Sequence, residues 1–151
     1  MSPDGVRITG VQHVGIPVSS LERSLAWYRD VFGLEPEFVV ESDSPETAAA
    51  VQLPGAHVTA AFLNVGNTYI ELLEYHNPIG DEFSLRNCDV GAVHVAIEVD
   101  SIDTAYARLT ARGAEFSAQP ATIPEGDLAG WKFAYFRDPD RIQFELFERP
   151  S

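Results

Sequence analysis

The amino-acid sequence repeats itself at an offset of 81 residues, and this repeat constrains the fold more than any other feature of the chain. Residues 13–33, HVGIPVSSLERSLAWYRDVFG, align with residues 94–113, HVAIEVDSIDTAYARLTARG. In both segments the apolar residues first alternate and then recur every three or four positions, which predicts a strand followed by a helix. Gly33 and Gly113 stand where the C-terminal end of a helix favours glycine. The chain is therefore predicted to contain one folding unit twice, with two-fold pseudosymmetry.

The remainder of each half also matches. Residues 61–75, AFLNVGNTYIELLEY, resemble residues 134–149, AYFRDPDRIQFELFER, and each segment predicts a strand, a short polar turn and a second strand. One further strand is expected between helix and hairpin, over 35–42 in the first half and 114–121 in the second. Each half is thus predicted to be a βαβββ module. The least regular segments are the loops 43–56 and 122–130.

Each predicted helix begins near residues that can cap its N-terminus. Ser19 and Glu22 have the spacing of a capping box. In this motif the side chain of the first residue accepts from the backbone N–H of the second, and the side chain of the second accepts from the backbone N–H of the first. Asp100 and Asp103 form a looser counterpart in the second half. We therefore expect Ser19 and Asp100 to be the N-cap residues.

The length of 151 residues fits one domain of the α+β class, covering residues 1–151. Module one spans about residues 8–76, and module two spans about residues 90–149. We expect the two modules to form a curved mixed sheet around a concave site.

Composition and charge limit the partners. With 45% hydrophobic and 22% charged residues the chain is ordinary for a soluble protein, and no apolar run approaches the ~20 residues of a membrane span. No secretory signal pattern opens the sequence, so we expect a cytoplasmic protein. A net charge of −13 disfavours nucleic acid and anionic membranes as partners. The single Cys88 excludes an internal disulfide and a cysteine-rich zinc site, so any metal ligands must be histidines and carboxylates.

Strand parity places four polar residues together. In the first strand of each module the alternating apolar residues face the helix, which leaves His13 and His94 on the opposite face. In the last strand of each module the same parity leaves Glu71 and Glu145 on that face. A lone histidine or glutamate in a strand is more often structural than a ligand. Two of each at equivalent positions of a repeat favour a divalent-metal site, because an unpaired buried carboxylate is costly.

The segments HVGIPVSSLERSLAWYRDVFGLE, GNTYIELLE, HVAIEVDSID and FRDPD…FELFE strongly resemble the vicinal-oxygen-chelate superfamily over about residues 8–148. This superfamily includes glyoxalase I, methylmalonyl-CoA epimerase, extradiol dioxygenases, fosfomycin-resistance enzymes and bleomycin-binding proteins. The resemblance implies that His13, Glu71, His94 and Glu145 ligate one divalent ion, which is Zn, Ni, Co, Mn or Fe. It also implies a homodimer, in some members of which each site is completed across the interface.

The chemistry implied by the resemblance is chelation of two neighbouring substrate oxygens by the metal, which stabilises a developing enolate or oxyanion. The ligand set looks most like that of bacterial glyoxalase I, and next most like that of the epimerase, where a Gln commonly replaces the residue at the Glu71 position. We therefore expect a small-molecule isomerase or lyase of the glyoxalase type that shifts a proton next to a carbonyl, with Glu145 or Glu71 as the catalytic base.

Two other functions stay open at the level of sequence. An Fe(II) extradiol-type dioxygenase uses two histidines and one carboxylate, so a fourth ligand at Glu71 would occupy a position that its substrates need. The third alternative is a non-catalytic small-molecule-binding or resistance protein.

Three features depart from the patterns of these families. The predicted strand over 57–63 lacks the carboxylate that similar bacterial epimerases place there. Arg141 stands where the family usually has the glycine of a DPDG turn. The basic residues that would bind the carboxylates of glutathione are not evident. Candidates by location alone are Lys132, Arg137 and Arg86.

Overall fold

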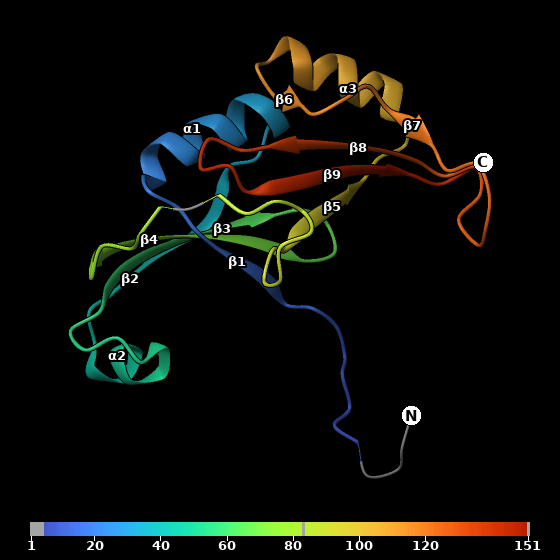
Figure 1. The fold of residues 1–151 in the computed structure, drawn as a ribbon. Coiled ribbons are helices and arrows are strands. Elements are labelled where there is room, and N and C mark those ends of the chain that lie inside the picture. Colours follow the sequence, from blue (N-terminus) through green and yellow to red (C-terminus); the bar gives the residue numbers. More distant parts are fainter. Residues whose placement is uncertain (1–4, 83, 151) are drawn as a thin grey trace.

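The computed structural model describes residues 5–82 and 84–150, and it contains two βαβββ modules (Figure 1). Module one consists of β1 (His13–Pro17), α1 (Leu21–Phe32), β2 (Pro36–Ser42), α2 (Pro45–Val51), β3 (His57–Asn64) and β4 (Tyr69–Asn77). Module two consists of β5 (His94–Glu98), α3 (Ile102–Ala111), β6 (Glu115–Phe116), β7 (Ala121–Thr122), β8 (Lys132–Arg137) and β9 (Gln143–Glu148). The predicted α+β class and the repeated element order are confirmed.

The strands form two mixed sheets with the same internal order. One sheet has the order β1-β4-β3-β2, and the other has the order β5-β9-β8-β6 with β7 also paired to β8. The first strand of each module runs parallel to the last strand, and the other pairs are antiparallel. Over residues 5–82 and 84–150 the strands form two separate sheets, and β1 and β5 each lie at the edge of one of them.

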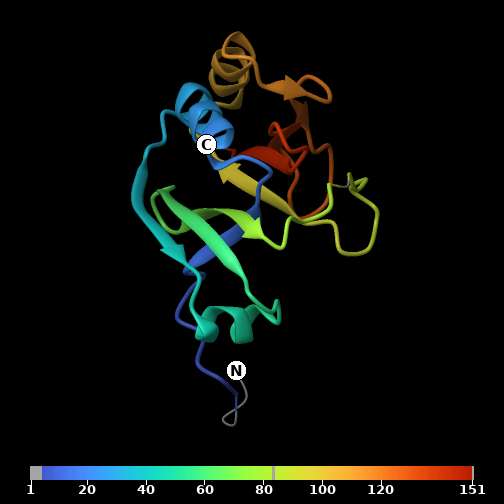
Figure 2. The ribbon, with the colours of Figure 1, turned by 90° about the vertical axis from the view of Figure 1, so that its left-hand side faces the viewer.

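The two modules join through a shared apolar core. Helix α1 lies against the sheet of module two (Figures 1 and 2), where the ring of Tyr28 meets that of Phe144 with centroids 5.9 Å apart. Phe32 also contacts Phe144, and it contacts Phe136 at a centroid distance of 5.9 Å. Burial of one such aromatic side chain stabilises the fold by roughly 1.5–3 kcal/mol. This packing explains why the modules meet through their helix-facing sides rather than by pairing of strand edges.

The alternation of buried and outward-facing residues along the strands agrees with the prediction. Ile16 and Val18 are buried on the side of the core, as are Ile70 and Leu72 of β4. In module two Phe144 and Leu146 are fully buried on the same side. The alternate residues of these strands therefore face away from the core, and these include the four candidate ligands.

The helices begin one residue later than expected. Ser20 and Ser101 are the N-cap residues, and their hydroxyls accept hydrogen bonds from the backbone N–H groups of Arg23 and Thr104. The prediction of Ser19 and Asp100 as caps is therefore wrong. The reason for Ser19 is tertiary, because its hydroxyl donates instead to Asp140 of module two.

A glutamate of the last strand completes each helix N-terminus. The Glu74 carboxylate accepts from the backbone N–H of Leu21 at 2.7 Å, and the Glu148 carboxylate accepts from that of Ile102 at 2.5 Å. A negative charge at this end of a helix is favourable, because the backbone N–H groups there are unpaired and the helix dipole is positive.

Two loop regions differ from the expected pattern. The segment 43–56 contains the short helix α2, which Ser44 caps through a hydrogen bond from the backbone N–H of Thr47. In place of the single strand expected over 114–121 the structure has two short strands, β6 and β7, with irregular backbone between them.

Among residues 5–82 and 84–150, no helix combines the length and the apolar character that crossing a membrane requires.

Asp140, in the turn between β8 and β9, links the modules at the start of α1. Its carboxylate accepts from the backbone N–H of Ser19 at 3.0 Å and from the Ser19 hydroxyl at 2.6 Å, and it pairs with the guanidinium of Arg23. Burial alone would raise the pKa of Asp140, but the hydrogen bonds from Ser19 and Arg23 outweigh it and hold the pKa below the usual 3.8.

The change Asp140→Asn is expected to lower the free energy of unfolding by about 1–3 kcal/mol at neutral pH, because it removes a charge-assisted contact between the modules. A lowered carboxyl pKa stabilises the folded state above the ordinary pKa, and this contribution is lost as the pH falls through the folded-state value. The difference between wild type and variant should therefore shrink below pH 4 in a series of urea denaturations. Asp127→Asn, which makes the same charge change in an exposed loop, is the control. Equal stability of the two variants at neutral pH would contradict this account.

Candidate metal centre

The first candidate pair lies on the adjacent strands β1 and β4. Strand β1 carries His13, strand β4 carries Glu71, and the register sets Gly15 opposite Glu71. The distance between His13 Nε2 and Glu71 Oε2 is 3.2 Å. The glutamate side chain is 14% exposed and the histidine side chain 41%, so the carboxylate is largely enclosed while the imidazole is accessible.

Module two repeats this arrangement with β5 and β9. Ala96 is opposite Glu145 in the register, and His94 Nε2 lies 3.2 Å from Glu145 Oε2. The Glu145 side chain is 9% exposed and that of His94 is 43% exposed. The two-fold repeat of the sequence is thus also a repeat of one histidine–carboxylate pair with the same distance and the same pattern of burial.

The chain brings the four predicted residues together as two pairs and not as one cluster. Among residues 5–82 and 84–150, no three or more His, Cys, Asp or Glu side chains are grouped so that they could hold one metal ion. The cause is the packing of the modules through their helix-facing sides, which leaves the two pairs on separate sheets. Each pair offers one imidazole nitrogen and one carboxylate oxygen, a donor set that suits Zn, Mn, Fe, Co or Ni.

Gly15 provides the space that the Glu71 carboxylate occupies. A Cβ atom at position 15 would lie 3.2 Å from Glu71 Oε2 and 3.4 Å from Leu73 Cδ1. The first distance is tighter than an ordinary contact, so a larger residue here would require the carboxylate to shift by a few tenths of an ångström. In module two Ala96 already carries such a methyl group beside Glu145.

An aromatic ring stands beside each pair. Phe62 is opposite Glu71 in the register, and its ring meets the His13 ring edge-on at 5.8 Å. The equivalent residue of module two is Tyr135, opposite Glu145, whose ring meets the His94 ring edge-on at 5.4 Å. Burial raises the pKa of the Tyr135 hydroxyl, and the nearby Glu145 carboxylate raises it further.

Sequence reasoning did not single out these two rings, although the signal was present. The alignment of residues 61–75 with 134–149 sets Phe62 over Tyr135. The repeat therefore conserves an aromatic position beside each pair and adds a hydroxyl to only one of them.

The three basic residues that the sequence offers for binding the carboxylates of glutathione have different partners. Lys132 is paired with Asp103 at 3.0 Å, and Arg86 is paired with Asp89. Arg137 donates to the Ser84 hydroxyl at 2.8 Å and to the backbone carbonyl of Leu85 at 3.2 Å, without a carboxylate within ion-pair distance in the described part of the chain.

Comparison with known proteins gives relatives that are epimerases and lactoylglutathione lyases. The chain is 33% identical over 146 residues to the 2-epi-5-epi-valiolone epimerase of Actinomyces sp, covering 93% of this chain and 80% of that protein. It is 32% identical over 118 residues to the mitochondrial methylmalonyl-CoA epimerase of Bos taurus, covering 75% of this chain but only 59% of the bovine protein. A probable lactoylglutathione lyase of Synechocystis is 27% identical over 143 residues, which cover 92% of this chain and 95% of that protein.

Solved structures share the fold. A glyoxalase family protein from Bacillus cereus superposes with a TM-score of 0.79 at 22% identity, covering 100% of this chain and 99% of that one. A fosfomycin resistance protein from Listeria monocytogenes, in complex with Mn(II) and sulfate, gives a TM-score of 0.62 at 20% identity and covers 95% of both chains. The sequence model of the Glyoxalase/Bleomycin resistance protein/Dioxygenase superfamily matches residues 10–146. With this match and its repeated βαβββ order, the chain belongs to that superfamily.

Proposed function

We propose that this protein is a divalent-metal-dependent isomerase or lyase that moves a proton next to a substrate carbonyl. The observation that carries the proposal is the recurrence of one histidine–carboxylate pair, at 3.2 Å, on equivalent strands of both modules. The pairs keep the same chemistry in two modules whose neighbouring residues differ, as Gly15 and Ala96 do. The epimerase that is 33% identical over 93% of the chain favours the isomerase over the lyase.

Two chains would complete each site. His13 and Glu71 of one chain and His94 and Glu145 of a second chain supply the four predicted ligands. The first strands β1 and β5 support this arrangement, because both lie at sheet edges whose backbone groups are free to pair with another strand. A homodimer joined in this way would contain two equivalent sites, as two-fold symmetry requires.

In the proposed reaction the residues of the chain would have separate roles. When bound, the divalent ion polarises neighbouring oxygens of the substrate and acidifies the adjacent C–H group. A carboxylate accepts the proton from carbon, and epimerisation requires that a proton return to the opposite face. Glu71 and Glu145, from different modules, are suited to these two tasks. The enclosure of both carboxylates strengthens their electrostatic interactions with a bound substrate.

The metal ligands are tested by direct binding. We expect about one divalent ion per chain in the wild-type protein, measured by elemental analysis and by calorimetry with Zn, Ni, Co, Mn and Fe(II). The changes His94→Ala and Glu145→Gln should each lower the affinity at least roughly 100-fold, because the loss of even a supporting residue costs about 10–100-fold. His57→Ala is the control, since His57 bonds to Glu41 at 2.6 Å and belongs to neither pair. A wild-type protein that binds none of these ions tightly would overturn the proposal.

Mixed dimers decide whether a site is shared between chains. One variant carries His13→Ala with Glu71→Gln, and the other carries His94→Ala with Glu145→Gln. Neither should bind metal alone, but a dimer of the two would contain one intact site. An equimolar mixture refolded together should recover roughly a quarter of the wild-type stoichiometry if the chains pair at random. No recovery in a mixture that forms dimers would exclude the shared site.

Gly15→Ala should weaken metal binding with little effect on folding. The added methyl group lies 3.2 Å from Glu71 Oε2 and would require the carboxylate to shift by a few tenths of an ångström, so we expect a loss of at most roughly tenfold in affinity. Gly10→Ala is the matched control, because a Cβ there meets no atom within 4 Å. Equal metal affinity of the two variants, measured by calorimetry, would show that metal binding does not depend on the present position of the Glu71 carboxylate.

Catalysis is tested by proton exchange with solvent. In D₂O the metal-loaded protein should place deuterium on the carbon next to the carbonyl of one member of a panel of α-oxo thioesters and hemithioacetals. Glu145→Gln should slow this exchange by about 10²–10⁴-fold if Glu145 is the base, and Glu71→Gln should do so if the base is Glu71. Oxygen consumption with a catechol, in the absence of any exchange, would instead identify a dioxygenase.

A further inference from the structure

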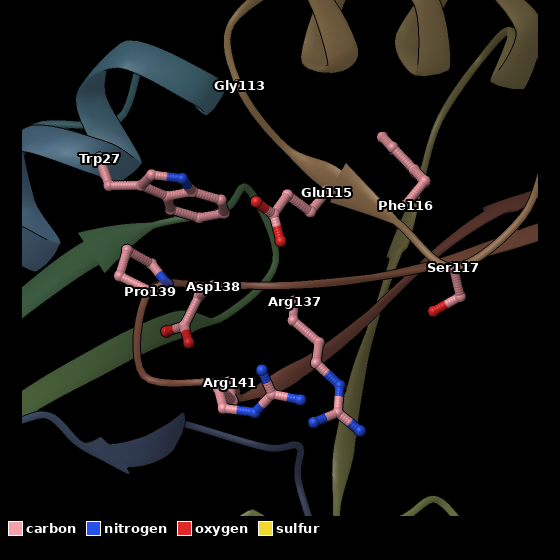
Figure 3. A pocket seen from close by; sticks show the side chains of 9 residues that line it. All are labelled: Trp27, Gly113, Glu115, Phe116, Ser117, Arg137, Asp138, Pro139 and Arg141. Carbon is pink, nitrogen blue, oxygen red and sulfur yellow. The ribbon is translucent and has the colours of Figure 1, made fainter.

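A cavity of about 530 Å³ opens at one end of the sheet of module two (Figure 3), and none of the four candidate ligands lines it. It lies between α1, β6 and the turn that joins β8 to β9. Arg137, the last residue of β8, and Arg141, in the turn, both line it. Figure 3 shows their guanidinium groups side by side on one wall of the cavity.

The two guanidinium groups converge on one oxygen atom. Arg137 Nη1 donates to the Ser84 hydroxyl at 2.8 Å, and Arg141 Nε donates to the same hydroxyl at 3.1 Å. Two like charges held this close repel each other, and a neutral hydroxyl compensates neither of them. The hydroxyl oxygen thus stands where an oxygen of an anion would be held more strongly.

Neighbouring carboxylates do not neutralise the arginines. Neither guanidinium has a carboxylate within 4.0 Å among residues 5–82 and 84–150, although the chain has 23 acidic residues against 10 basic ones. Glu115 and Asp138 also line the cavity. Asp138 is committed elsewhere, since it accepts from the Tyr28 hydroxyl and from backbone N–H groups in its own turn. Glu115 is opposite Arg137 in the register but forms no ion pair with it.

Arg141 occupies a backbone conformation that disfavours it. Its φ is +66°, in the left-handed region where a side chain is strained and glycine is not. The corresponding hairpin turn of module one places a glycine, Gly66, at its positive φ. Gln52, the C-cap of α2, also has a positive φ, so the conformation of Arg141 supports a role for its side chain only together with the convergence of the two guanidinium groups.

Arg137 shares a sheet face and a register row with the candidate ligands of module two. The register aligns Arg137 of β8 with Gln143 of β9, and Gln143 with His94 of β5. Side chains in register on neighbouring strands lie on the same face of a sheet. Two strand spacings separate Arg137 from His94, a distance of about 10 Å between their backbones. The backbone carbonyl of Leu85 accepts hydrogen bonds from both Arg137 and Gln143, so a molecule that contacts the arginines and the ligands of module two must extend past this segment.

We propose that Arg137 and Arg141 form an anion-binding subsite that holds a phosphate ester or a carboxylate of the substrate. Guanidinium groups bind these anions through paired N–H donors, and two of them together favour a group with more than one charged oxygen. The evidence for the anion-binding subsite is the geometry of the two arginines. Its role in binding the substrate rests on the proposed function. The substrate class is then an anionic carbonyl compound, whose carbonyl end lies toward His94 and Glu145.

The subsite is tested on the full-length, metal-free protein by NMR titration with sodium phosphate and with sodium acetate, against sodium chloride at equal ionic strength. Phosphate or acetate should bind, and Arg137→Gln and Arg141→Gly should each raise the Kd at least about tenfold. Arg108→Gln makes the same charge change as Arg137→Gln on the exposed face of α3 and should alter the Kd less than about twofold. The anion that binds more tightly identifies the group on the substrate.

Thermal unfolding separates loss of the subsite from loss of the fold. Arg141→Gly removes the strain at φ +66°, so its melting temperature should equal or exceed that of the wild type while anion binding falls. The proposal is overturned if neither anion binds better than chloride, or if Arg108→Gln weakens binding as much as the two cavity variants do. Because no metal is present, these outcomes do not depend on whether the metal centre exists.

Discussion

The contact between helix α1 and the sheet of module two is the constraint on which the rest of the structure depends. Tyr28 and Phe32 fill the side of the sheet formed by Phe136 and Phe144, and all four belong to or pack against one apolar core. A duplicated module can join its copy by strand edges or by helix-facing sides. The apolar surface buried here favours packing through the helix-facing sides within one chain. Asp140 adds hydrogen bonds between the modules at the start of α1.

This choice has a direct consequence for the chemistry. Because the core takes the inner faces of both sheets, the opposite faces and the edges of β1 and β5 remain outside it. Each histidine–carboxylate pair lies on such an outer face, and the fold of one chain does not bring the two pairs together. The same packing that stabilises the chain therefore makes a second chain the natural source of the missing ligands in the function that we propose.

Much of this organisation could be predicted from the sequence, since periodicity and repetition are local signals. The βαβββ order, the parity of Ile16 and Leu72, and the pairing of each histidine with a glutamate follow from alternation along the strands. The prediction for the N-cap of α1 is wrong because the Ser19 hydroxyl donates to Asp140, a residue 121 positions away in sequence. Parity likewise indicates which face a side chain occupies but not whether two sheets meet, so it could not separate one cluster of four residues from two pairs.

The differences between the modules carry as much information as their likeness. The ligand pairs are the same in both, but the residues around them are not: Gly15 corresponds to Ala96, and Phe62 corresponds to Tyr135. The turn after the third main strand contains Gly66 in one module and the strained Arg141 in the other. In the shared site that we propose, the two modules would supply different walls: among residues 5–82 and 84–150, module two adds the Tyr135 hydroxyl and two guanidinium groups without a carboxylate partner. Such asymmetry suits the substrate that we propose, because a site with identical walls would bind its anionic end and its carbonyl end equally well in either place.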